Sequence, residues 1–204
     1  MSRSLKILIF STVIIVTAAA ALWIVGSKRM RYSTSLLIDA PPADVFDYLT
    51  DTELMKKWVD GLVEVVPVTE EPNQIGSRAR TIIQQDGKRI EYEDEIIRYE
   101  KDSILTIKAT NRLVTHTSIY RLEPKENDKT QFTFVVKTTN HGFGKLLAPL
   151  FRSPIEQKIA EDAQRLKELV EGTSREPNSL DTLPTAPNET ETLTSGSSED
   201  NQNP

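Results

Sequence analysis

The sequence predicts an α+β fold in which an antiparallel sheet packs against one long C-terminal helix, behind a transmembrane helix at the N-terminus. Three observations predict this fold. Residues 7–25 are apolar and carry no charge. Between residues 61 and 140, six segments with strand-like composition follow one another through short connections. After residue 154, apolar side chains recur at spacings of three and four, which indicates an amphipathic helix.

The composition excludes several kinds of site. The chain of 204 residues contains no Cys and only two His, His116 and His141. Neither a disulfide framework nor a thiolate or His-rich metal site can form from these residues. We therefore expect no metal and no cofactor. The sequence also has no basic patch with interleaved aromatic residues, so we expect no nucleic acid partner.

The apolar segment from Ile7 to Val25 predicts a membrane anchor, which we assign to residues 1–30. As a helix it would be about 28 Å long, close to the hydrocarbon thickness of a bilayer. Basic residues bracket the segment, and Trp23 stands where an interfacial aromatic residue is expected. Nothing nearby could cover a helix that is apolar all round. We therefore expect a single-pass membrane protein.

A cleaved signal peptide is the alternative interpretation of this segment. Arg3 and Lys6 would form its basic region, and Ala18–Ala21 would supply the small residues of a cleavage site. The apolar run continues through residues 22–25, beyond the usual length for a signal peptide, and this favours the uncleaved anchor. Basic residues flank both ends of the segment almost equally, so the positive-inside rule leaves the orientation of the folded domain open.

The first strand and first short helix of the domain follow the anchor. Residues 32–39, YSTSLLID, have the β-branched and apolar content of a strand. Pro41 and Pro42 end this strand and suit the first turn of a helix, while Asp44 favours the positive end of the helix dipole. Three apolar side chains share one face of this helix: Val45, Phe46 and Leu49.

A second short helix is predicted immediately afterwards. Thr50 and Glu53 have the spacing of a capping box, so we expect a helix that runs to Trp58 and ends at Gly61. Trp58 is expected to anchor the core rather than to serve as a platform for a ligand.

The chain from residue 61 to residue 140 is typical of successive β-hairpins. Asp86-Gly87 is the strongest turn signal, because this dipeptide suits a type I′ turn. Since all the connections are short, the strands are predicted to be antiparallel neighbours. The predicted strands are 61–68, 77–85, 89–99, 104–111, 115–123 and 130–140.

A long helix is the last predicted element of the domain. Its apolar positions are separated by Glu, Lys and Arg, and they are Ile155, Ile159, Asp162 or Ala163, Leu166 and Leu169. Pro149 and Pro154 are expected to restrict the regular helix to the residues after 154, and Gly172 is expected to end it.

The remaining residues, 173–204, are predicted to form a disordered acidic tail. They contain no aromatic residue and are rich in Ser, Thr, Asn, Pro and acids. Such a composition cannot bury enough apolar surface to offset its ordering entropy.

The order of these elements resembles that of the START-like (SRPBCC) superfamily, in particular its polyketide cyclase/dehydrase and lipid-transport proteins. Two segments carry the resemblance: IDAPPADVFDYLTDTELMKKWVDGLVEV at residues 38–65 and IAEDAQRLKELVEG at residues 159–172. The resemblance covers residues 31–172. It implies a helix-grip fold, in which a strongly bent sheet wraps around the long helix and the two short helices fill the opening beside the first two strands. It also implies a cavity for apolar or amphipathic molecules, and it supplies no shared catalytic residue.

Turn lengths predict which residues lie opposite one another in the sheet. The two-residue Asp-Gly turn, a four-residue turn at 100–103, a pairing of Thr110 with Thr115 and a loop centred near residue 127 define the registers. The row of opposite residues that they predict is Ala79, Asp94, Ala109, His116 and Thr138.

Alternation along the strands predicts which face of the sheet lines the cavity. Ile90, Tyr92 and Ile96 share a side with Asp94, whereas three Glu occupy the other side, so the first set should face the helix. The predicted cavity wall includes Tyr92, Asp94, His116, Tyr120, Phe134 and Thr138.

Asp94 and His116 are the candidate acid/base or ligand-orienting pair. They would lie two strands apart, roughly 10 Å, so that a ligand or waters could sit between them. In the alternative interpretation, both side chains lie near the rim of the sheet and are simply hydrated.

Three functions fit this sequence. The first is membrane-anchored binding of a hydrophobic small molecule or lipid in the helix-grip cavity, with that molecule and the membrane as partners. The second is an enzyme of the cyclase, dehydratase or hydrolase type that uses the same cavity, for which convergent polar groups inside would be evidence. The third is an interaction module with a filled core.

Overall fold

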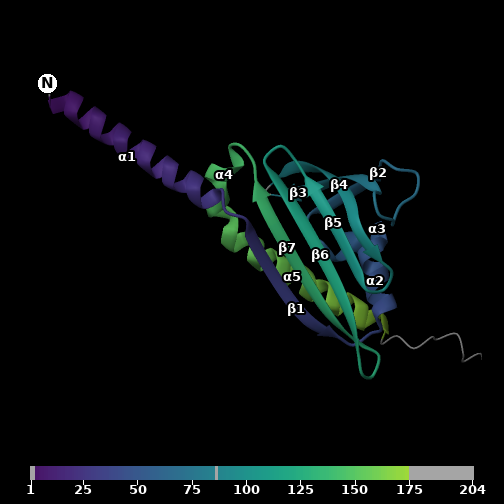
Figure 1. The fold of residues 1–204 in the computed structure, drawn as a ribbon. Helices are drawn as coiled ribbons and strands as arrows, with labels where there is room; N and C mark the ends of the chain where they lie inside the picture. The colour runs from purple at the N-terminus through teal and green to yellow at the C-terminus, as the bar shows by residue number, and fades with distance from the viewer. Residues whose placement is uncertain (1–2, 86, 175–204) are drawn as a thin grey trace, which may run out of the picture.

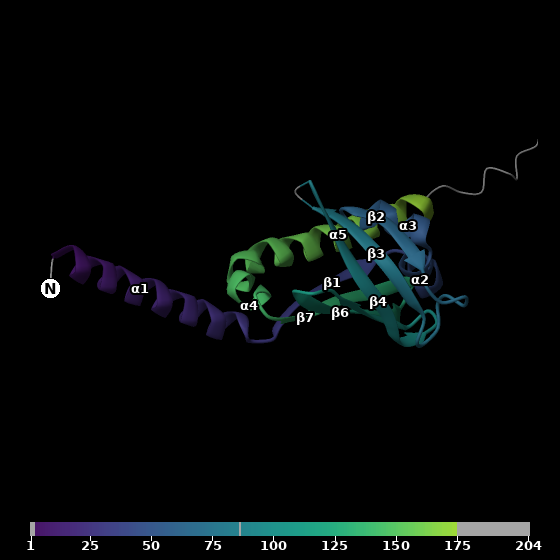
Figure 2. The same ribbon diagram turned by 90° about the horizontal axis from the view of Figure 1, so that it is seen from above.

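The computed structural model describes residues 3–85 and 87–174, and it consists of a curved antiparallel sheet, a long C-terminal helix beside it and a separate N-terminal helix (Figures 1 and 2). The sheet has seven strands in the order β1-β7-β6-β5-β4-β3-β2. The strands are β1 (Met30–Ile38), β2 (Leu62–Pro67), β3 (Arg78–Gln85), β4 (Lys88–Glu100), β5 (Ile104–Thr110), β6 (Val114–Lys125) and β7 (Lys129–Asn140). The predicted α+β helix-grip fold is confirmed, and each strand ends within two residues of its prediction.

Two short helices connect the opposite edges of this sheet. β1 and β2 are consecutive strands in the sequence, but they form the two edges, so the chain between them has to cross the open side of the sheet. α2 (Pro42–Thr50) and α3 (Thr52–Trp58) make this crossing. The indole N–H of Trp58 donates to the carbonyl of Tyr48 at 2.8 Å and ties the two helices together.

The cap of α3 differs from the prediction. The side chain of Asp51 accepts hydrogen bonds from the backbone N–H groups of Glu53 (2.8 Å) and Leu54 (3.0 Å). Thr50 is still the last residue of α2, and its hydroxyl donates to the carbonyl of Phe46 at 3.0 Å. The predicted capping box at Thr50 and Glu53 is therefore wrong in its capping residue, because the Thr50 hydroxyl already serves the preceding helix.

The C-terminal helical segment begins earlier than predicted and continues further. α4 (Gly144–Leu147) and a 3₁₀ turn, η1 (Ala148–Phe151), precede α5 (Arg152–Ser174). Pro154 falls in the first turn of α5, where a missing N–H costs no intrahelical hydrogen bond. The prediction that Gly172 ends the helix is wrong, since α5 runs on to Ser174.

The core lies between α5, α2, α3 and the inner face of the sheet. α5 contributes a buried stripe whose members are Ile159, Ala163, Leu166 and Val170. Trp58 is 1% exposed and lies edge-on to the rings of Tyr120 and Phe134, with centroids 6.1 and 6.4 Å away. This burial agrees with the expectation that Trp58 anchors the core.

The N-terminal helix α1 (Arg3–Gly26) projects away from the domain (Figures 1 and 2). Its 24 residues have a mean hydropathy of 2.5 over the most apolar stretch, none of which is buried in the protein. It is long and apolar enough to cross a membrane, two properties that a signal sequence near an N-terminus shares. The predicted tail lies outside the described residues apart from 173 and 174.

Candidate functional site

A cavity of about 710 Å³ lies between the inner face of the sheet, α3 and α5. This volume falls in the range of small-molecule sites. Apolar side chains from the sheet and from the helices beside it form most of the wall. Polar side chains also contribute, and they include Thr81, Tyr92, Asp94, Asn111, His116, Ser118, Thr138, Asn140 and Asp162. A largely apolar wall with a few polar groups suits an amphipathic molecule.

One row of paired residues crosses the cavity wall. Consecutive partners in this row are Met30, Thr138, His116, Ala109, Asp94 and Ala79. All five predicted members are therefore paired as expected. Ala109 separates Asp94 from His116, and its single methyl group leaves room above the sheet between the carboxyl group and the imidazole.

The predicted register between β4 and β5 is correct at Asp94 because two differences from the predicted hairpin cancel. Glu100 pairs with Ile104, so the turn has three residues rather than four. The register then shifts by one between Ile96 and Arg98, where a β-bulge interrupts the pairing. The shorter turn and the bulge compensate for each other, and Asp94 meets Ala109.

Asp94 is the principal polar group of the cavity wall. The hydroxyl of Thr81 donates to its Oδ2 at 2.6 Å, whereas its Oδ1 is buried and has no hydrogen-bond partner among the described residues. Burial raises the pKa of Asp94 to about 6, against the opposing effect of the Thr81 hydrogen bond. At neutral pH the side chain is mainly a carboxylate with one free buried acceptor atom.

His116 lies across Ala109 from Asp94. Its Nδ1 is 3.0 Å from the hydroxyl of Thr138, and burial lowers its pKa to about 4, so the imidazole is neutral at physiological pH. The ring of Tyr92 lies 5.8 Å from that of His116, between centroids. Burial, together with the nearby Asp94 charge, raises the pKa of Tyr92, so its phenol stays protonated. The Tyr92 hydroxyl, which can donate a hydrogen bond, and the Asp94 carboxylate, which can accept one, thus line the same cavity.

All six residues predicted for the cavity wall line the cavity. Tyr92, Asp94, His116 and Thr138 form its polar part. Tyr120 and Phe134 belong instead to its aromatic floor, where their rings stack 4.7 Å apart and Tyr120 is 6% exposed. Participation of any of the six in ligand binding stays a prediction.

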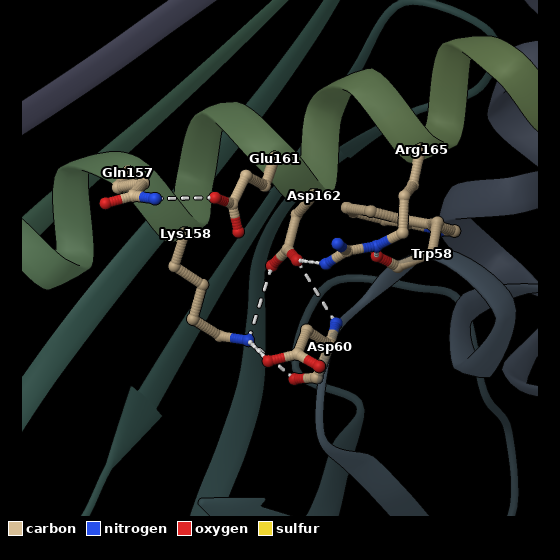
Figure 3. A network of polar contacts seen from close by, with 7 residues as sticks. All are labelled: Trp58, Asp60, Gln157, Lys158, Glu161, Asp162 and Arg165. Carbon is tan, nitrogen blue, oxygen red and sulfur yellow. Dashed lines mark hydrogen bonds and ion pairs between the residues drawn. The ribbon is translucent and has the colours of Figure 1, made fainter.

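Asp162 is a cavity residue that was not among the predicted site residues. It is 5% exposed, lines the cavity from α5, and lies in a polar network (Figure 3). Its Oδ1 accepts from the guanidinium of Arg165 and, at 3.2 Å, from the backbone N–H of Asp60. Lys158 lies 3.8 Å from its other carboxylate oxygen. Its position three residues after Ile159, on the apolar stripe, was the signal that could have identified it.

The same network attaches α5 to the chain between α3 and β2. The ammonium of Lys158 donates to the carbonyl and carboxylate oxygens of Asp60, at 2.7 and 2.8 Å, and Arg165 Nε donates to the carbonyl of Trp58 at 3.1 Å (Figure 3). The hydrogen bond and charge of Lys158 lower the pKa of Asp60. Burial raises the pKa of Asp162, outweighing the two neighbouring cations. We interpret this network as a structural attachment.

Comparisons with known proteins agree with this architecture. The family model described as "Polyketide cyclase / dehydrase and lipid transport" matches residues 29–171. Among curated proteins, none matches this sequence.

Solved structures share the fold at low sequence identity. TTHA0849 from Thermus thermophilus is 17% identical to this chain, with a TM-score of 0.59. The match covers 71% of this chain and 99% of TTHA0849. The Zhui aromatase/cyclase from Streptomyces sp. R1128 is 11% identical, with a TM-score of 0.63 and coverages of 73% and 98%. The di-domain ARO/CYC StfQ from the steffimycin biosynthetic pathway is 12% identical, with a TM-score of 0.59, and the match covers 72% of this chain and 52% of StfQ.

Proposed function

Because this chain belongs to the polyketide cyclase/dehydrase and lipid transport family, we propose that it binds an amphipathic, mainly hydrophobic small molecule or lipid in its cavity while α1 anchors it to a membrane. We divide the chain accordingly into an anchor at residues 1–30, a binding domain at 31–172 and a tail at 173–204. The observation that carries the proposal is the apolar cavity with a free buried acceptor, Asp94 Oδ1, in its wall.

The polar group of the ligand sits over Ala109, between Asp94 and His116. A hydroxyl group there would donate to Asp94 Oδ1, which otherwise stays buried without a hydrogen bond, a condition that costs free energy. The apolar part of the ligand would extend along the side chains of Ile107, Tyr120 and Phe134. A cavity of about 710 Å³ supports ligand binding rather than a filled core.

Native mass spectrometry of the full-length protein, purified in mild detergent from its own membrane, tests the proposal. We expect a co-purifying apolar molecule. Ala109→Leu adds a side chain inside the cavity and should remove this molecule, whereas Lys108→Leu adds the same side chain on the exposed outer face and should leave it bound. Equal retention by the two variants, or an empty wild-type protein, would contradict binding in the cavity.

The second candidate function is an enzyme that uses the same cavity. The feature that favours it is the buried Asp94 carboxyl group in the cavity wall, because burial raises its pKa to about 6 and such a group is suited to proton transfer near neutral pH. Once the co-purifying molecule is known, an enzyme would convert it or a precursor, and Asp94→Asn would abolish conversion while retaining the ligand. Recovery of unchanged ligand from the wild-type protein would leave binding as the function.

A further inference from the structure

The last turn of α1 is attached to the segment that follows β7. Gly26 is buried there, and a Cβ atom at this position would lie 1.7 Å from the carbonyl oxygen of Lys145. The amide of Asn140 donates to the carbonyl of Gly26 at 3.2 Å, and the ammonium of Lys145 lies 5.3 Å from the centre of the Trp23 ring. These contacts hold α1 and α4 together at one end of the domain (Figure 1).

The loop between β5 and β6 lies at the same end. The backbone N–H of His141 donates to the carbonyl of Leu113 at 2.7 Å, and a Cβ atom on Gly144 would lie 2.4 Å from that carbonyl oxygen. Two large apolar side chains are nevertheless exposed here: Leu113 is 44% exposed and Phe143 is 62% exposed. Both are therefore held beside the end of α1 while their side chains face solvent.

The contacts with Gly26 fix the depth of these residues relative to a membrane. When residues 7–25 occupy the hydrocarbon core, Gly26 lies at its boundary with the headgroups. Lys145 and Asn140 contact Gly26. Leu113 contacts Gly144, and Phe143 directly precedes Gly144 in the chain. Exposed apolar side chains beside that boundary are suited to insertion into the interface.

The charges at this end suit an anionic surface. Residues 26–31, 108–118 and 137–149 carry no acidic residue. Their basic residues are Lys28, Arg29, Arg31, Lys108, Arg112, Lys137 and Lys145. The loops at the opposite end, residues 69–77, 99–104 and 123–130, carry seven acids and three bases. The charge asymmetry thus follows the long axis of the domain, with the basic end at α1.

The cavity extends to this basic end. Its wall runs from Thr69, Pro72 and Asn73 at the acidic end to Leu113, Gly144 and Leu147 at the basic end, and it also includes Lys88 at the tip of the β3–β4 hairpin. Leu113 lines the cavity and is also exposed, so it belongs both to the wall and to the outer surface.

We propose that this end of the domain docks on a bilayer surface containing anionic lipid, with Leu113 and Phe143 inserted into the interface and Arg112 and Lys145 facing the headgroups. Docking in this way places the basic end of the cavity, with Leu113 in its wall, beside the bilayer from which a ligand would enter. This inference rests on the proposed membrane anchor and specifies the surface that the anchored domain contacts.

Site-specific fluorescence tests this arrangement, because the chain has no native Cys. Single variants Leu113→Cys and Phe143→Cys of the full-length protein are labelled with an environment-sensitive dye. They are reconstituted into vesicles of phosphatidylcholine, with or without phosphatidylglycerol, that contain acyl-chain quenchers. We expect a blue shift and strong quenching at both positions with phosphatidylglycerol and a clear loss of both signals without it. Circular dichroism confirms that each labelled protein is folded.

Two further labels separate this inference from the anchor. Val16→Cys, in the middle of α1, should be quenched in both kinds of vesicle, whereas Ile75→Cys, 67% exposed in the loop before β3, should be quenched in neither. An unquenched label at 16 would contradict the anchor itself. A quenched label at 16 with unquenched labels at 113 and 143 would leave the anchor intact and overturn docking. Equal quenching at 113 and 143 in the two kinds of vesicle would overturn the requirement for anionic lipid. The double variant Arg112→Gln, Lys145→Gln tests the same requirement independently, and we expect it to abolish the difference in quenching between the vesicles.

Discussion

Asp94 and His116 share the cavity wall, and burial shifts their pKa values in opposite directions. The folded-state pKa of Asp94 is raised from 3.8 to about 6, and that of His116 is lowered from 6.5 to about 4. In both cases burial favours the neutral form. Between about pH 4 and pH 6 both groups are neutral in the folded protein, while both are charged when the chain unfolds.

These shifts predict opposite pH dependences for two variants. Between pH 4 and 6 the folded state holds a proton on Asp94 that the unfolded state lacks, so this group makes stability fall as pH rises. His116 has the reverse effect between pH 4 and 6.5. In Asp94→Asn, where only the His116 effect remains, the free energy of unfolding should therefore rise with pH relative to wild type, by up to about 3 kcal/mol. In His116→Gln it should fall by a similar amount relative to wild type.

Urea unfolding across this pH range, performed on the chain without residues 1–26 and followed by the fluorescence of Trp58, measures both trends. Comparison with the wild-type protein removes the background from all other titrating groups. Parallel curves for the three proteins would show that neither side chain titrates in the way that its burial requires.

At the scale of single elements, α3 depends on one capping side chain. Asp51 accepts two backbone N–H groups, whereas the Thr50 hydroxyl bonds within α2. Asp51→Ala should lower the free energy of unfolding by about 1 kcal/mol, and Thr50→Ala should lower it by clearly less. Denaturant midpoints of the two variants provide the measurement, and a larger loss for Thr50→Ala would restore the capping box as the correct interpretation.

The end of α5 supplies a second test at this scale. Gly172 lies inside the helix, and a Cβ atom there would meet no atom within 4 Å. Gly172→Ala should raise the free energy of unfolding by roughly 0.5–1 kcal/mol, because alanine loses less backbone entropy than glycine in a helix. Thermal unfolding measures the change. A destabilised variant would mean that residue 172 ends the helix in the left-handed conformation.

At the scale of the whole molecule, the Asp162 network connects α5 to the chain between α3 and β2. Asp162→Ala removes the acceptor of Arg165 and of the Asp60 N–H, and should lower the free energy of unfolding by about 1–3 kcal/mol. Glu161→Ala is the matched control, because Glu161 is exposed and bonds only to Gln157 of its own helix among the contacts described; its effect should stay within about 0.5 kcal/mol. Equal effects in urea unfolding would show that the network contributes little to stability.

The proposed anchor is tested on the whole chain. The full-length protein should remain in the membrane fraction after an alkaline carbonate wash, because the segment from Ile7 to Val25 is long enough to span the bilayer. A chain that begins at Ser27 should be released by the same wash. Immunoblotting of the two fractions measures this. A mature N-terminus near Leu22 would instead identify a cleaved signal peptide.

Local patterns determined the elements and most of the pairings. Strand alternation, the Asp-Gly turn and the short connections act between neighbouring residues, so the pairing of Ala79 with Asp94 and the row from Ala109 to Thr138 could be predicted from turn lengths. The pairing of Asp94 with Ala109 was predicted from a turn one residue too long, and a β-bulge compensates for the difference. The placement of Tyr92, Asp94, His116 and Thr138 in one wall followed from the same periodicity. The sequence by itself also determined the apolar α1 and the absence of Cys.

Only the tertiary structure decided which groups are paired, which are left without partners, and where the cavity ends. The β-bulge near Ile97, the cap at Asp51 and the continuation of α5 past Gly172 each depend on contacts or geometry that local propensity does not specify. The partner of Asp94 Oδ2 comes from Thr81 of β3, whereas Oδ1 is left without one among the described residues. The joint position of Leu113, Phe143 and Gly26 depends on segments far apart in the chain. Such contacts are decided by packing over the whole domain, because burial and hydrogen bonding are properties of the assembled structure rather than of any one segment.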